Sequence, residues 1–184
     1  MAPPASECEM VDAIADAVRR AVSELFENRP NETFYYCSLT TTGEGHAPTL
    51  TAWSREALAD AVHAAGDGPN VGVDVKWSYA DSPYFNFGAH HFETVRAAFD
   101  GRDEIHPRTE ALQDRLNEVE LRLGAMEKAV ARLDAEGLFG TGERRLRMVL
   151  NVEVMPPDHT NVSRALRLNP REALADWLAE AAEP

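Results

Sequence analysis

Residues 74–84, DVKWSYADSPY, gather the side chains in this chain that are best suited to bind a ligand. Lys76 offers a positive charge, Trp77 an apolar platform and Asp81 a hydrogen-bond acceptor, and Tyr84 follows in the same loop. The segment covers the end of a predicted strand and the loop that leaves it. Binding residues are common at such places, because the sheet holds the base of the loop rigid. The structural alternative is that Trp77 belongs to the core and that the aromatic residues fix the loop.

Histidines and carboxylates occur together at several places, but without the spacing of a strong metal motif. His90 and His91 are adjacent, so on a helix their side chains would point about 100° apart and would not readily share one ion. His90 and Glu93 do have helical ligand spacing, although no second pair of this kind accompanies them. Glu44 and His46 lie in a predicted turn and are candidate ligand or partner contacts. We therefore expect no metal and no cofactor.

Nucleophilic motifs are missing from the sequence. The two cysteines, Cys8 and Cys37, form neither a disulfide framework nor a zinc motif. Cys37 lies in a predicted strand and is interpreted as a small buried side chain. The chain has no GxSxG elbow and no glycine-rich GxGxxG or Walker-type turn. The sequence therefore identifies no catalytic residue and excludes the usual dinucleotide and nucleoside triphosphate signatures.

Helices and a hairpin must position the candidate residues. Ser6 and Glu9 have the spacing of a capping box, which predicts the start of the first helix. Residues 34–40 and 48–54 predict two strands that pair as a hairpin, and Ser54 can cap the helix that follows. Heptad spacing of apolar residues over 112–133 predicts one long helix. That helix either packs on its own domain or forms the seam of a homodimer.

Two further segments show the alternation of a strand. Residues 71–77 and 146–155 each place apolar side chains on one face and polar side chains on the other. If both strands belong to one sheet, Asp74 and Lys76 would share a charged face, and that face would also carry Arg147, Asn151 and Glu153. It would be either a binding surface or simply a face exposed to water. Asn169 is the predicted cap of a last helix, with proline at the first helical position. We expect one α+β domain over residues 1–184, with a mainly antiparallel sheet of about four or more strands and helices packed on it.

The charge of the chain excludes some partners. It has 18 lysines and arginines against 31 aspartates and glutamates, a net charge of −13. Nucleic acids and anionic membranes are therefore poor partners, because binding to phosphate needs a basic surface. A basic protein remains compatible with this charge, which otherwise serves solubility. No apolar run approaches the roughly 20 residues of a membrane helix, and no signal segment is apparent, so we expect a cytoplasmic protein.

Three motifs, in their order and spacing, resemble a known family. They are FYYCSLTTTGEG at 34–45, PTLTAWS at 48–54 and KWS at 76–78. Together with the chain length, they resemble the bacterial family called domain of unknown function 4303 over most of the chain. The resemblance implies a small cytoplasmic α/β protein that stands alone, and it brings no established activity or catalytic residues. Several acidic families of this size serve as partners in bacterial toxin-immunity systems, which is an analogy.

Two functions remain open from the sequence. The first is a non-enzymatic acidic module that binds a basic protein partner, in the manner of an immunity protein, through its charged surface and the loop with Lys76, Trp77 and Asp81. The second is a sensor or enzyme that binds a small molecule in a pocket near residues 77–84, with Glu44 or His46 nearby. A homodimer through the long helix would be compatible with either.

Overall fold

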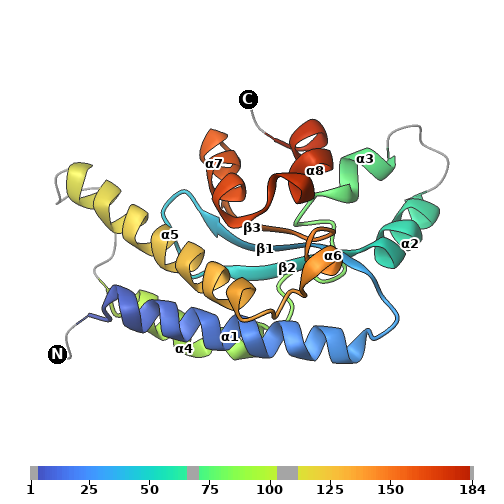
Figure 1. Cartoon of the computed structure of the whole chain (residues 1–184). Helices are drawn as coiled ribbons and strands as arrows, with labels where there is room; N and C mark the ends of the chain where they lie inside the picture. Colours follow the sequence, from blue (N-terminus) through green and yellow to red (C-terminus); the bar gives the residue numbers. More distant parts are fainter. Residues whose placement is uncertain (1–3, 66–70, 103–111, 183–184) are drawn as a thin grey trace.

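A three-stranded mixed sheet forms the centre of the protein (Figure 1). The computed structural model describes residues 4–65, 71–102 and 112–182. Strand β1 (Phe34–Thr42) lies in the middle; β2 (Thr49–Ser54) pairs with it in antiparallel orientation and β3 (Val149–Met155) in parallel orientation. The hairpin and the α+β class are confirmed. The predicted sheet, mainly antiparallel with four or more strands, is wrong for the part of the chain that the structure describes.

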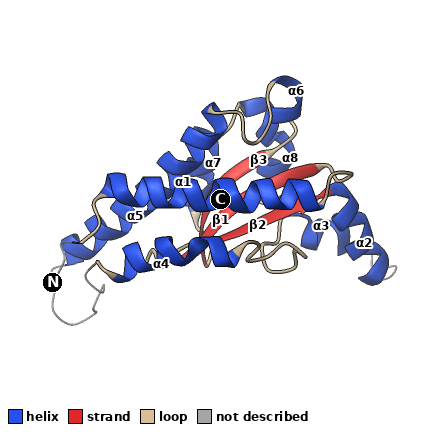
Figure 2. Cartoon of the chain, turned by 90° about the horizontal axis from the view of Figure 1, so that it is seen from below, coloured by secondary structure: helices blue, strands red, loops and turns tan. Residues whose placement is uncertain are grey.

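Helices cover both faces of the sheet. Helices α1 and α4 lie on one side together with α5, while α3, α7 and α8 lie on the other (Figure 1). Figure 2 looks from the side of α1 and α4, which stand in front of the strands. The bounds of the helices are α1 Glu7–Asn28, α2 Arg55–Ala65, α3 Val71–Lys76, η1 Ala89–Phe92, α4 Glu93–Asp100, α5 Leu112–Ala135, α6 Gly142–Arg145, α7 His159–Leu168, η2 Arg171–Leu174 and α8 Ala175–Glu180.

Local signals in the sequence set the helix ends as predicted. The Ser6 hydroxyl accepts a hydrogen bond from the Glu9 amide, and the Glu9 carboxylate accepts one from the Ser6 amide, which completes the capping box of α1. The Ser54 hydroxyl accepts from the Ala57 amide at 3.0 Å and caps α2. The long helix α5 packs along α1, and its buried side includes Met126 and Leu133. Its second half therefore lies on its own domain, as one of the two alternatives predicted.

Side chains of α7 occupy the free edge of β3 and replace a fourth strand. Asn161 pairs with both backbone groups of Val154, at 2.8 and 3.1 Å, and Asn169 pairs with both backbone groups of Leu150, at 2.9 and 2.6 Å. Between them, Arg164 donates to the Val152 carbonyl at 2.6 Å. An edge strand leaves a row of unpaired amides and carbonyls. These three side chains, together with Asn151, which accepts from the Val152 amide at 2.9 Å, satisfy the edge groups, so the sheet ends at β3.

Residues 71–76 form the short helix α3, which corrects the predicted third strand. The edge of β2 that this strand would need is covered by the loop after α3, because Ser82 donates to the Ala52 carbonyl at 2.5 Å and the Phe87 amide to the Leu50 carbonyl at 3.1 Å. A segment forms a strand only where a neighbouring strand has a free edge to pair with, and alternation of polar and apolar residues does not supply such an edge. The side chain of Asp74, which belongs to the polar face of that predicted strand, lies outside the described part of the structure.

Asn169 also differs from its predicted role. It is the C-terminal cap residue of α7, a helix that the sequence did not predict, and its side chain is bound to β3 rather than to the next helix. The turn that follows is the 3₁₀ helix η2, without a side-chain cap at its start. Among the described helices, none combines the length and the apolar character that crossing a bilayer requires.

Candidate functional site

The two faces of the sheet differ sharply in polarity. The face toward α1 carries apolar side chains such as Leu39 and Val152. On the opposite face Ser38 stands between Thr51 of β2 and Asn151 of β3, and Thr40 pairs with Glu153. We call six buried residues of this face with polar groups the polar layer; they are Tyr36, Ser38, Thr40, Thr51, Asn151 and Glu153.

None of the four hydroxyl groups of the polar layer makes a hydrogen bond of good geometry within the described residues. The oxygens concerned are those of Tyr36, Ser38, Thr40 and Thr51, all fully enclosed. A buried polar group without a partner costs about 1–3 kcal/mol, so native proteins keep few of them. The Tyr36 hydroxyl lies close enough to Ser38 and Glu153 for both groups to act on its pKa, so part of the polar layer faces itself within the chain.

Glu153 is the ionisable group of the polar layer. Its side chain is 5% exposed, and one carboxylate oxygen accepts a hydrogen bond from Asn151 at 3.1 Å. Arg164 lies near but donates to the Val152 carbonyl and to Asn161. Burial raises the pKa of the Glu153 carboxyl above its usual value, because charge is unfavourable in a low-dielectric interior. Burial and the facing Glu153 carboxylate likewise hold the pKa of the Tyr36 phenol well above its usual value.

A cavity of about 490 Å³ gives access to Glu153. Its volume lies within the range of sites for small molecules. The lining combines two carboxylates and three aromatic rings with small and apolar groups, and no lysine or arginine of the described chain lines it. The lining residues are Trp77, Ser78, Tyr79, Glu153, Met155, Pro157, Asn161, Trp177, Glu180 and Ala181. We call this space the Glu153 cavity.

Trp77 forms one wall of the Glu153 cavity and is held from several sides. Its indole N–H donates to Glu180 on α8 at 2.8 Å, and the Lys76 ammonium donates to the same oxygen at 2.7 Å. The Tyr35 hydroxyl donates to the Lys76 carbonyl at 2.5 Å. The ring of Trp77 meets Tyr36 edge-on, with 5.8 Å between the ring centroids. The wall is therefore fixed by contacts to both the sheet and α8.

A larger cavity of about 920 Å³ lies on the other side of Trp77. Its charged lining residues are Arg55, Lys76 and Arg147, and opposite them Glu172 and Asp176. Because both signs are present, this cavity does not favour a ligand of one charge. Trp77 thus belongs to the lining of both cavities.

The other predicted site residues lie elsewhere. Asp81 is exposed and accepts from the Ser78 hydroxyl at 2.6 Å, while Tyr84 is buried and donates to Glu32. Both therefore hold the loop. Glu44 and His46 form an exposed pair, 3.6 Å apart, in the turn that joins β1 to β2. This turn is at the opposite end of the hairpin from the strand residues under Trp77, so the expectation that they lie near that loop is wrong.

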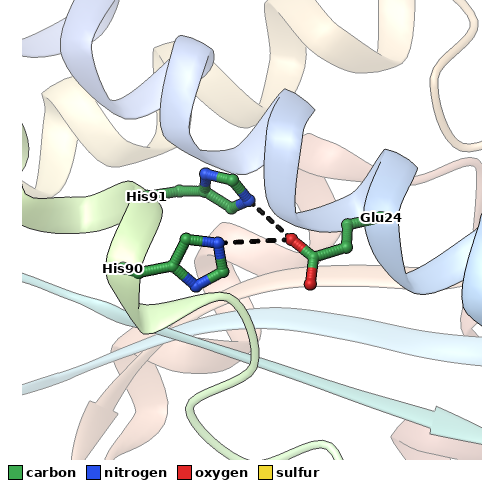
Figure 3. A group of neighbouring side chains, drawn as sticks. All are labelled: Glu24, His90 and His91. Atoms are coloured by element: carbon green, nitrogen blue, oxygen red, sulfur yellow. Dashed lines mark hydrogen bonds and ion pairs between the residues drawn. The ribbon is translucent and has the colours of Figure 1, made fainter.

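Cysteine and histidine residues also have defined places. Cys37 is buried as predicted, and burial raises the pKa of its thiol to about 12. His90 and His91 do not diverge as the helical spacing predicted, because both rings face Glu24 on α1 (Figure 3). This cluster lies in the α1 and α4 layer and is separate from the Glu153 cavity.

Sequence reasoning named Glu153 on a charged strand face that was either a binding surface or exposed to water, and it missed the hydroxyl residues of the polar layer, which are Tyr36, Ser38, Thr40 and Thr51. A signal was present in the alternation of polar residues on the hairpin's first strand, since every second residue from position 36 carries a hydroxyl. An interior strand with one polar face must bury that face against something. The sequence did not indicate that this strand pairs with β3, and that pairing brings its hydroxyl residues next to Glu153.

Comparison with known proteins identifies the family. The family model for a domain of unknown function, DUF4303, matches residues 14–170. This range contains all three strands and every residue of the polar layer. No curated protein and no solved structure matches the chain at a significant level. The chain therefore belongs to the DUF4303 family.

Proposed function

We propose that the protein binds a small organic molecule with a basic amine, held in the Glu153 cavity against the polar layer. The observation that carries this proposal is the buried Glu153 carboxyl, which opens into a cavity walled by aromatic rings. A titratable group with a perturbed pKa inside a pocket is typical of functional sites. This proposal develops the small-molecule alternative that the sequence left open.

The chemistry of the lining favours a cation. Glu153 supplies negative charge once it is ionised, whereas Glu180 is already paired with Lys76. The rings of Trp77, Tyr79 and Trp177 supply the electron-rich faces that attract an ammonium group. The net charge of −13 adds a long-range attraction for cations. An amine that reaches Glu153 would gain a charge-assisted hydrogen bond from its N–H group to the carboxylate.

Thermal shift and tryptophan fluorescence with a panel of amines test this proposal. Tryptamine, phenethylamine and choline are suitable probes, each compared with a neutral analogue of the same shape. A ligand at a hundred times its dissociation constant stabilises by about 2.7 kcal/mol, or roughly 5–11 °C for a chain of this size. Glu153→Gln should abolish the effect of an amine, and Glu143→Gln, on an exposed surface, should leave it unchanged.

The pH dependence provides a second check. The bound amine favours the ionised carboxylate, so affinity should fall as the pH falls through the raised pKa of Glu153. No shift with any amine, or equal shifts in the wild-type and Glu153→Gln proteins, would contradict amine binding in this cavity.

The charge of −13 favours a second candidate function, the binding of a basic protein partner as predicted from the sequence. A pull-down of the tagged protein from its native cells, followed by mass spectrometry, tests it. A basic partner recovered at comparable stoichiometry and released by salt would support this role. A pull-down without such a partner would contradict it.

A further inference from the structure

Two histidines and one glutamate converge between α1 and η1, away from the Glu153 cavity. Nε2 of His91 lies 2.7 Å from Oε2 of Glu24, and Nε2 of His90 lies 3.4 Å from the same oxygen (Figure 3). The centroids of the two imidazole rings are 3.9 Å apart, and the ring planes are tilted by 45°. One ligand atom of each of the three residues lies within 4.8 Å of the others.

The backbone around η1 builds this arrangement. Gly88 precedes η1 with a φ of +65°, and a Cβ at this position would come within 2.6 Å of the Cβ of Ala21 on α1. Glycine therefore allows both the left-handed backbone and the close approach of η1 to α1. Phe92, 1% exposed, anchors the other end of η1 in the core. The histidines are thus carried by a segment that is fixed on both sides.

We propose that Glu24, His90 and His91 bind a divalent transition-metal ion of the Zn²⁺ class. Imidazole nitrogen and carboxylate oxygen are ligands that Zn²⁺ prefers, with bonds of about 2.0–2.2 Å. In a tetrahedral site such bonds separate the ligand atoms by about 3.3 Å. The two observed separations from the Glu24 oxygen, 2.7 and 3.4 Å, need only a small adjustment to meet this value.

The site would be open to solvent on one side. The side chain of His90 is 64% exposed, that of His91 is 18% exposed and that of Glu24 is 38% exposed. Three protein ligands leave the fourth tetrahedral position for water or another small ligand. The bound ion would therefore exchange with ions in the solvent, whereas the ion of a closed structural zinc site does not.

Isothermal titration of the metal-free full-length protein with ZnCl₂ tests the site. The titration uses a Cys8→Ser background, because Cys8 is an exposed thiol on the same helix. We expect one Zn²⁺ per chain and no comparable binding of Mg²⁺, which prefers oxygen ligands. His91→Ala should weaken Zn²⁺ binding at least about tenfold, since even residues that only support a metal ligand contribute 10–100-fold. His46→Ala removes an imidazole that faces a carboxylate elsewhere and should have no effect.

Glu24→Gln keeps the test valid if a histidine variant fails to fold. It preserves the size of the side chain and a hydrogen-bond acceptor but removes the charge, so it should also weaken Zn²⁺ binding. A Co²⁺ absorption spectrum that is lost in this variant would confirm the ligand set. Absence of Zn²⁺ binding by the folded protein, or weak binding shared equally by all the variants, would overturn the proposal.

Discussion

Replacement of Asn169 by alanine should destabilise the protein strongly, because this one side chain closes part of the free edge of the sheet. Its carbonyl oxygen accepts from the Leu150 amide at 2.9 Å and from Arg145 at 3.0 Å. Its amide nitrogen donates to the Leu150 carbonyl at 2.6 Å and to the Ala165 carbonyl at 2.9 Å. Alanine removes all four bonds.

The magnitude follows from the groups that alanine leaves behind. Leu150 is fully buried, so its amide and its carbonyl would both lose their partner inside the protein. Each such orphaned group costs about 1–3 kcal/mol, which gives about 2–6 kcal/mol for the pair. This is a large part of the 5–15 kcal/mol that stabilises a typical domain.

Urea unfolding followed by circular dichroism measures the effect. The midpoint should fall while the dependence on urea concentration stays the same, which separates a loss of stability from a change of unfolded state. Asn117→Ala is the matched control, because Asn117 is exposed on α5 and its side chain bonds that of Gln113 and no other among the described residues. Its effect should stay within about 0.5 kcal/mol. A loss below 1 kcal/mol for Asn169→Ala would refute the idea that α7 replaces a strand.

Three further predictions follow from buried or strained positions. Because burial raises the pKa of Glu153, the folded chain keeps a proton that the unfolded chain releases, so the free energy of unfolding falls as the pH rises from about 4.5 through the raised pKa. Glu153→Gln should lack this loss and should be more stable than the wild-type protein in urea at pH 8. Equal pH profiles of the two proteins would contradict this prediction. Ellman's reagent should label Cys8 in the native protein and Cys37 only after denaturation, since the buried thiol has a pKa raised to about 12; rapid labelling of both would disprove this. Gly88→Ala should lower the free energy of unfolding by about 1–2 kcal/mol because of the positive φ, and further because the new Cβ would contact Ala21. The same urea assay measures this loss. An unchanged midpoint would mean that η1 does not need its close approach to α1.

Interactions within a few residues were predictable from the sequence. The capping box of Ser6 and Glu9, the cap at Ser54 and the β1–β2 hairpin all depend on neighbours in the chain, and each is present. The same holds for the burial of Cys37, which follows from its apolar strand neighbours. Such local sequence patterns determine which segments form helices and strands and where these end, whatever they later pack against.

Interactions between distant segments were not predictable by the same reasoning. Residues 71–76 alternate like a strand but form a helix, because the edges of the described sheet are already covered. Asn169 has the sequence context of a helix cap, yet Leu150, far away in the chain, offers it two backbone groups. Local propensity loses to such contacts, since an unpaired strand edge costs more than a missing cap.

The candidate site depends on the same long-range contacts. Asn161 satisfies both backbone groups of Val154 at the sheet edge and also lines the Glu153 cavity. One residue of α7 thus takes part both in ending the sheet and in forming the wall over the polar layer. A fourth strand in place of α7 would extend the sheet in its own plane and would not provide this wall. The short mixed sheet and the buried carboxyl beside its cavity are therefore two consequences of one helix that packs against the edge of β3.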